Sequence, residues 1–154
     1  MNDRQEVLEK ARSYAFLLLK FRLRSESELL CRLRLKKFDI DIARETVAFL
    51  KEKGFIDDKV FAKTWIASRL KRPLGLARIR HELRIKGVKE PLIDDEIRAA
   101  RKDYPEEEIV SSLAKARFSR CKDAIPAIAK RRVVAYLLRR GFPPELVTEV
   151  VDRF

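Results

Sequence analysis

Apolar residues recur every three or four positions along most of the chain, which is the spacing of helices that bury one face. No Asn-Gly or Asp-Gly pair and no sustained alternation of apolar and polar residues indicates a strand. Helix start signals are frequent: Ser25-x-x-Glu28 is a capping box, and Asp57 and Asp58 can cap a helix that begins near Lys59. Glycine follows three apolar runs, where a left-handed residue ends a helix: Gly54, Gly87 and Gly141. The pattern predicts an all-α fold of about nine helices joined by short turns.

The apolar pattern also repeats along the chain. Residues 29–47 align with residues 79–97 at an offset of 50, and these align with residues 133–151 at a further 54. The coinciding apolar positions are Leu29/Ile79/Val133, Leu33/Leu83/Leu137, Phe38/Val88/Phe142, Ile42/Leu92/Leu146 and Val47/Ile97/Val151. Lys37, Gly87 and Gly141 share the column of the intervening turn. Each copy is therefore predicted to be an antiparallel helix pair.

A further helix is predicted before each pair, over Glu6–Phe21, Lys59–Arg72 and Pro105–Arg120. The apolar stripe of the first of these helices consists of Val7, Ala11, Tyr14, Leu18 and Phe21. Phe and Trp residues fall on such stripes, so we expect them to pack in the core. The sequence thus predicts three tandem three-helix repeats, over residues 1–54, 55–104 and 105–154, that form an elongated, curved helical array.

Charge changes this picture because it is unevenly distributed. The chain has 36 Lys and Arg residues against 24 Asp and Glu residues, a net charge of +12. Residues 59–104 carry a net +7, whereas residues 1–58 carry +2 and residues 105–154 carry +3. A field of that sign attracts nucleic acid or an acidic protein surface, and the charge alone does not decide between them.

The excess centres on RLKRPLGLARIRHELRIKGV, residues 69–88, which Pro73 and Gly75 divide into the end of one helix and the start of the next. Its candidate residues for binding nucleic acid or an acidic protein surface are Arg69, Lys71, Arg72, Arg78, Arg80, Arg84 and Lys86. A second cluster, in the third repeat, consists of Lys130, Arg131, Arg132, Arg139 and Arg140, and a weaker one in the first repeat of Arg24, Arg32, Arg34, Lys36 and Lys37. If the repeats stack, these clusters form a basic stripe along one side. Base-specific readout is not indicated, because no recognition helix, zinc finger or exposed aromatic platform is evident.

Acidic residues one helical turn away can pair with the basic residues of the middle stretch, and only the unpaired ones keep their full charge for a partner. Glu82 lies four positions from both Arg78 and Lys86 and can neutralise part of the run. Arg80 and Arg84 have no acidic residue three or four positions away, so we expect them to be unpaired. A binding role would explain two unpaired arginines one turn apart, and a solvated helix face is the alternative.

Motifs for catalysis are missing from the sequence. There is no Gly-rich phosphate loop ending in Lys-Ser or Lys-Thr, and the acidic pairs Asp57/Asp58 and Asp94/Asp95 stand at helix starts, where they serve as caps. His81 falls on the outer face of its helix with no Cys, Ser or acidic constellation beside it. Two cysteines 90 positions apart and a single His make no metal-ligand cluster. We therefore predict a protein that is not an enzyme and uses no metal and no cofactor.

The cellular location is inferred from what the N-terminal half contains. The residues MNDRQE are unlike a signal peptide, and the longest apolar run, Tyr14 to Leu19, is far shorter than the ~20 residues that span a bilayer. No disulfide framework is implied, which suits a reducing compartment. We expect a cytoplasmic monomer with no membrane contact.

Composite motifs over nearly the whole chain, from about Ala11 to Phe154, resemble those of the RecX family of bacterial recombinase regulators. They lie in SESELLCRLRLKKF, in FLKEKGFIDDKVFAKTWIASRLKRPLGLARIRHELRIKGV and in the closing Leu-Leu-Arg-Arg-Gly-Phe. Lys37 stands where the family usually has a turn glycine. The resemblance implies a protein of tandem three-helix repeats that binds the RecA recombinase. It would lodge in the groove of the RecA–single-stranded-DNA filament and limit filament growth, strand exchange and coprotease activity.

A second reading rests on the charge rather than on the motifs. A general DNA-binding module of helical repeats would also present a basic face, and weak binding of single- or double-stranded DNA is compatible with both readings. A steep salt dependence of binding to naked DNA would favour the general module.

Overall fold

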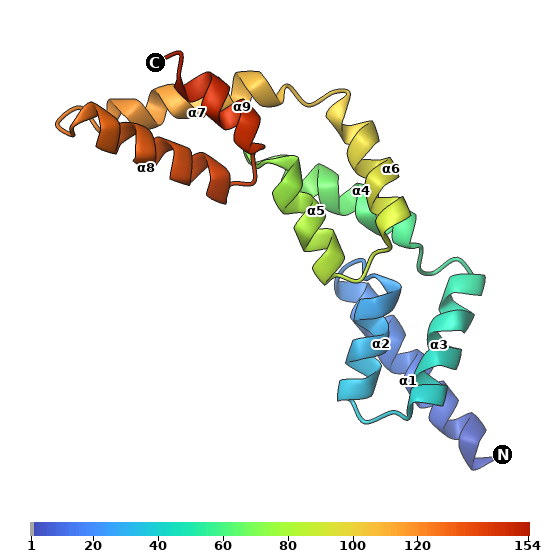
Figure 1. The fold of residues 1–154 in the computed structure, drawn as a ribbon. Helices are drawn as coiled ribbons and strands as arrows, with labels where there is room; N and C mark the ends of the chain where they lie inside the picture. The colour runs from blue at the N-terminus through green and yellow to red at the C-terminus, as the bar shows by residue number, and fades with distance from the viewer. Residues whose placement is uncertain (1) are drawn as a thin grey trace. The chain divides into compact units, whose positions relative to one another are not determined.

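The computed structural model describes residues 2–154 and contains helices alone as regular elements within that range. Figure 1 shows the helices in chain order. Their bounds are α1 Asp3–Phe21, α2 Glu26–Leu35, α3 Ile40–Glu52, α4 Asp58–Arg69, α5 Leu76–Ile85, α6 Glu90–Arg101, α7 Glu106–Ser119, α8 Pro126–Arg139 and α9 Pro144–Val151. The all-α prediction is confirmed, and the helix bounds agree with the predicted ones to within a few residues.

The chain divides into two compact units. The first unit consists of residues 2–65 and Leu83–Ile93, and the second of Ile66–Glu82 and Asp94–Phe154. Helices α4, α5 and α6 therefore each contribute residues to both units.

The core of the first unit lies where α1 packs against α2 and α3. Its two buried clusters are Leu8, Ala11, Leu33, Ile42 and Ala43, and Ala15, Leu18, Leu29, Leu50 and Ile56. The buried residues of α1 are Leu8, Ala11, Ala15 and Leu18. The predicted stripe is confirmed at Ala11 and Leu18, and its members Val7 and Tyr14 are partly buried against the core. Phe21, the last residue of the helix, is 78% exposed. The expectation that the Phe residues pack in the core is therefore wrong for Phe21.

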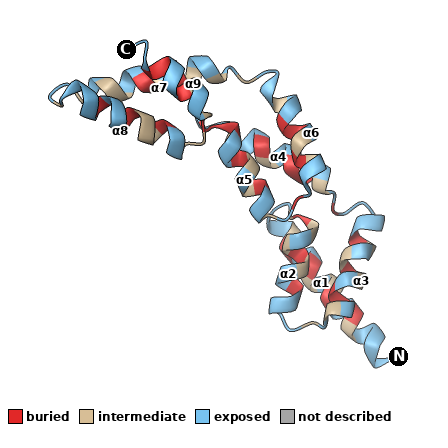
Figure 2. Cartoon of the chain, viewed as in Figure 1, coloured by how far each residue is buried: buried red, intermediate tan, exposed pale blue. Residues whose placement is uncertain are grey.

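The core of the second unit lies among α7, α8 and α9. Its buried cluster consists of Val110, Ala114, Val133, Leu137, Phe142, Val147, Val150 and Val151. Pro126 and Pro144 stand in the first turns of α8 and α9, where a missing N–H costs no hydrogen bond. In Figure 2 the buried residues fall on one side of most helices and the exposed residues on the other, which is the arrangement that the apolar spacing predicts.

The predicted repeat is visible in burial and in backbone conformation. All six side chains of the columns Leu29/Ile79/Val133 and Leu33/Leu83/Leu137 are fully buried. The turn column adopts the left-handed conformation in all three copies, with φ of 76° at Lys37, 77° at Gly87 and 89° at Gly141. Lys37 therefore takes the glycine conformation although it carries a side chain.

Candidate functional site

The basic residues of α5 are paired with acidic residues of α6. Arg80 forms an ion pair with Asp94, and Arg84 forms one with Glu90. The prediction that Arg80 and Arg84 are unpaired was therefore wrong. The spacing within α5 excludes partners on the same helix, but both acidic residues come from the next helix, which helical periodicity alone does not reveal.

Glu82 forms ion pairs with an arginine at the end of α4 and with one near the start of α5. The Arg69 guanidinium donates to both carboxylate oxygens of Glu82, at 2.9 and 2.8 Å. The Arg78 Nε lies 3.5 Å from the same carboxylate, so the predicted contact between Arg78 and Glu82 is confirmed. One carboxylate thus faces two guanidinium groups.

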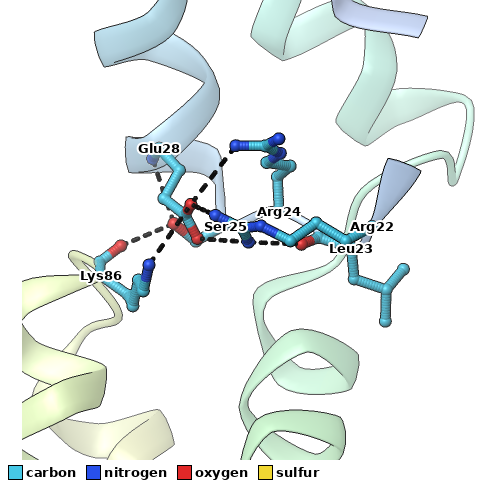
Figure 3. A network of polar contacts seen from close by, with 6 residues as sticks. All are labelled: Arg22, Leu23, Arg24, Ser25, Glu28 and Lys86. Carbon is cyan, nitrogen blue, oxygen red and sulfur yellow. Dashed lines mark hydrogen bonds and ion pairs between the residues drawn. The ribbon is translucent and has the colours of Figure 1, made fainter. Parts of the chain in front are cut away.

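Lys86 pairs within the first unit, in a network around Glu28 (Figure 3). The Glu28 carboxylate binds the Arg22 guanidinium, and the Lys86 Nζ and the Arg24 guanidinium lie 3.7 and 3.9 Å from it. The Lys86 ammonium also lies 5.1 Å from the centre of the Trp65 ring. Three cations therefore converge on one largely buried carboxylate.

Burial and charge oppose each other in this network. Burial acts to raise the pKa of Glu28, but the hydrogen bond and charge of Arg22, with the charge of Lys86, outweigh burial, so that the pKa is lowered. Burial lowers the pKa of Arg24, and the charge of Arg22 adds to that effect. The Nε of Arg24 is buried without a hydrogen-bond partner among the described residues.

Five arginines line one cavity in the second unit. The cavity has a volume of about 260 Å³, and its walls are Arg69, Arg72, Leu74, Arg78, Tyr136, Arg139 and Arg140. The predicted clusters of the second and third repeats, some 70 positions apart in the sequence, therefore meet here. Two of these five arginines, Arg69 and Arg78, form ion pairs with the carboxylate of Glu82.

Gly75 and Gly141 allow the backbone before α5 and the turn after α8 to lie in direct contact. The N–H of Gly75 donates to the carbonyl oxygen of Arg140 at 2.8 Å, and the Arg140 guanidinium donates to the carbonyl oxygen of Pro73 at 3.1 Å. A Cβ on Gly75 would overlap the carbonyl group of Gly141, and a Cβ on Gly141 would overlap the Cβ of Arg78. The cavity wall therefore depends on backbone contacts that only glycine permits.

The remaining predicted residues lie outside the cavity. Lys130 pairs with Asp152 at 3.1 Å, and Arg132 lines a separate hollow beside Cys121. Arg131 and Lys71 are exposed, and neither takes part in an ion pair within residues 2–154. The charged residues of the weaker first cluster are partly used internally, since Arg34 donates to the carbonyl oxygen of Phe38 at 3.0 Å.

Sequence reasoning missed Tyr136 and Arg22. The ring of Tyr136 lies in the cavity wall between Arg117, at 4.3 Å from its centre, and Arg140, at 5.2 Å. Arg22 could have been found from the repeat, because it occupies the column of Arg72 at the same offset of 50.

The one histidine, His81, is exposed. None of the helices over residues 2–154 has the length and apolar character to cross a membrane.

Comparison with known proteins gives concordant results. Models of the three successive three-helix domains of RecX match residues 11–50, 57–96 and 105–151. A "Regulatory protein RecX" of Corynebacterium efficiens is 38% identical, covering 97% of this chain and 77% of its own length. One of Amycolatopsis mediterranei is 32% identical, covering 96% of this chain and 84% of its own length. The crystal structure of RecX from Lactobacillus salivarius is similar with a TM-score of 0.84 and 20% identity, covering 97% of both chains.

Proposed function

This chain belongs to the RecX family of regulatory proteins, and from that premise we propose that it binds the RecA recombinase and the groove of the RecA–single-stranded-DNA filament. Binding there inhibits the recombinase, ATPase and coprotease activities of RecA and so moderates DNA repair and the SOS response.

The observation that carries this proposal is the meeting of two basic clusters at one cavity, in a chain that matches all three RecX domains. A filament groove offers phosphates and acidic protein surface side by side, and an arginine-rich surface is suited to both. The proposal includes the candidate residues Arg69, Lys71, Arg72, Arg78, Arg80, Arg84, Lys86, Lys130, Arg131, Arg132, Arg139 and Arg140.

The ion pairs rank these candidates. Arg80 and Arg84 already face Asp94 and Glu90, so part of their charge is neutralised before any partner arrives. Arg72 and Arg139 are exposed and form no ion pair within the part of the chain that the structure describes. We therefore expect Arg72 and Arg139 to contribute more to filament binding than Arg80 and Arg84.

The test is the rate of ATP hydrolysis by RecA on single-stranded DNA. The protein, added well below the molar amount of RecA, should lower this rate, and the double variant Arg72→Glu/Arg139→Glu should lose most of the effect. Arg98→Glu/Arg101→Glu is the matched control, because both are exposed arginines of α6 outside the cavity and their replacement changes the net charge equally. An unchanged rate together with no detectable binding to the filament would overturn the proposal.

The net charge of +12 favours a second candidate, a general DNA-binding module. That function predicts tight binding to naked DNA with an affinity that falls steeply as salt rises. Equal filament inhibition at salt concentrations that abolish binding to naked DNA would exclude it.

A further inference from the structure

The two compact units contain the same helix-to-turn junction. In the first unit the hydroxyl of Ser25 donates to the carbonyl oxygen of Lys86 at 2.6 Å. In the second unit the N–H of Gly75 donates to the carbonyl oxygen of Arg140 at 2.8 Å. Ser25 and Gly75 occupy one column of the repeat, at an offset of 50, and Lys86 and Arg140 occupy another, at an offset of 54. The repeat therefore preserves the two positions that are joined, although the donor is a side-chain hydroxyl in the first unit and a backbone N–H in the second.

The junctions differ in the charge of the residue three positions after Ser25 or Gly75 (the central residue of the junction). In the first unit the central residue is Glu28, and its carboxylate receives Arg22 and Lys86. The corresponding residue of the second unit, at the offset of 50, is Arg78.

Two of the three cations around Glu28 have basic counterparts in the second unit, whereas Arg24 corresponds to Leu74. Arg72 and Arg140 correspond there to Arg22 and Lys86, and both line the cavity together with Arg78. The second junction thus keeps the cations that correspond to Arg22 and Lys86 and has Arg78, a further cation, in the position of Glu28.

We propose that this arginine-lined cavity is a binding site for a multiply charged phosphate ligand, which supplies the negative charge that Glu28 supplies in the other junction. The ligand is a group of linked phosphates, held by Arg72, Arg78, Arg139 and Arg140. Arg69 also lines the cavity, and its guanidinium is bound to Glu82.

Charge and size select this ligand class. Five guanidinium groups line the cavity, whereas Glu82 contributes one negative charge to the group, so a single carboxylate would leave most of the positive charge uncompensated. Linked phosphates carry several charges, and the planar guanidinium fork binds phosphate oxygens in pairs. The cavity has a volume of about 260 Å³, against about 30 Å³ for one water in the liquid, and so accommodates more than one phosphate group.

Two sources supply linked phosphates. One is a free polyphosphate, such as the chain of a nucleoside triphosphate, and the other is the backbone of a nucleic acid. This inference concerns residues that the proposed function also uses, but it stands without RecA, because phosphate binding is measured on the protein alone.

The test titrates the full chain with sodium tripolyphosphate by calorimetry at low ionic strength, with a thermal unfolding curve at each concentration. We expect saturable binding at one site and a ligand-dependent rise in Tm. Arg78→Glu restores to this junction the carboxylate of the other one, so it should raise the Kd by about tenfold or more, the equivalent of one charge-assisted hydrogen bond. Arg98→Glu changes the net charge equally and should leave the Kd unchanged.

The double variant Arg72→Gln/Arg139→Gln covers the case that Arg78→Glu does not fold. Both side chains are exposed, so the variant should keep its Tm without ligand and still lose tripolyphosphate binding. Equal affinity of the wild type, this variant and Arg98→Glu for tripolyphosphate and for an oligothymidylate alike would overturn the proposal.

A second series with an oligothymidylate separates the two sources. If the cavity variants lose both ligands, the site accepts phosphates from either source, and if they lose only the oligonucleotide, its ligand is the nucleic-acid backbone. Oligonucleotide and tripolyphosphate binding that are both independent of the cavity residues would overturn the proposal. Loss of polyphosphate binding with intact inhibition of RecA would leave it standing and separate it from the proposed function.

Discussion

The hydroxyl of Ser25 holds two segments that lie 61 positions apart. It donates to the carbonyl oxygen of Lys86 at 2.6 Å and accepts from the N–H of Glu28 at 3.1 Å. The side chain is fully buried, so neither bond can be replaced by water. One hydroxyl group therefore caps α2 and fixes the end of α5 beside it.

Ser25→Ala should remove both bonds at once. We expect a loss of about 2 kcal/mol in the free energy of unfolding, since a lost N-cap costs about 1 kcal/mol and an unpaired carbonyl adds a similar amount. Denaturant unfolding followed by circular dichroism measures the difference. Asp57→Ala is the matched control: Asp57 caps α4 at an exposed site, at 2.9 Å from the N–H of Lys59, and its loss should cost only about 1 kcal/mol. Equal costs would show that the bond to Lys86 contributes nothing.

Glu28→Gln should flatten the acid limb of the stability curve. The folded pKa of Glu28 lies below its ordinary value of 4.5, so its ionisation stabilises the protein above that value, and this contribution is lost as the pH falls through the folded pKa. The variant should be less stable than the wild type at neutral pH, by about 2 kcal/mol, and the difference should shrink below pH 4.5. Unfolding by urea at a series of pH values measures it, and a difference that stays constant down to acid pH would contradict the assignment.

Asp58→Asn, unlike Glu28→Gln, should not lower the stability of the folded protein at neutral pH. Burial raises the pKa of Asp58, so its ionised form is disfavoured in the folded protein once the pH rises through the folded pKa. Asparagine keeps an oxygen that can accept from the N–H of Glu26, now 2.9 Å from the Asp58 Oδ1, without carrying the charge. We expect the variant to be at least as stable as the wild type at pH 7. Asp58→Ala, which removes the acceptor, should cost about 1 kcal/mol.

Lys37→Gly should stabilise the first helix pair. Lys37 adopts a φ of 76°, a conformation that costs a residue with a Cβ about 1 kcal/mol relative to glycine. Lys37→Ala keeps the Cβ and should give no comparable gain, so comparing the two Tm values isolates the backbone effect from the loss of charge. A gain of equal size in both variants would mean that charge repulsion, rather than backbone strain, is relieved.

Gly75→Ala should be among the most damaging single-methyl additions in this chain. Its φ is unremarkable, but the new Cβ would overlap the backbone of Gly141, so we expect a loss of about 3 kcal/mol or more. Gly54→Ala has open space around its Cβ and a φ of 78°, so only the backbone penalty of about 1 kcal/mol remains. Thermal unfolding of both variants should rank them in this order, and the reverse order would refute the close contact between Gly75 and Gly141.

The sequence was sufficient to predict the helices and their repetition, because both follow from the spacing of apolar residues along the chain. The column of Lys37, Gly87 and Gly141 predicted three equivalent turns, and all three adopt the same backbone conformation. Motifs spread over nearly the whole chain also sufficed to identify the family.

Pairing between helices could not be predicted in the same way. The search for partners of Arg80 stayed on its own helix, but Asp94 lies on α6, where only the packing of the helix pair brings it within reach. The cavity was missed for a related reason. Its arginines belong to two clusters, around Arg72 and Arg139, and nothing in either cluster indicates that they face each other.

Helices α4, α5 and α6 are a single repeat in the sequence but are divided between the two compact units. The repeating segment of the sequence therefore does not coincide with a compact unit of the structure. A fragment of residues 57–96 would carry incomplete pieces of two cores, whereas duplication of such a fragment within a longer chain supplies the missing neighbours at once. New copies in this architecture thus gain their stability from adjacent copies and have little of their own.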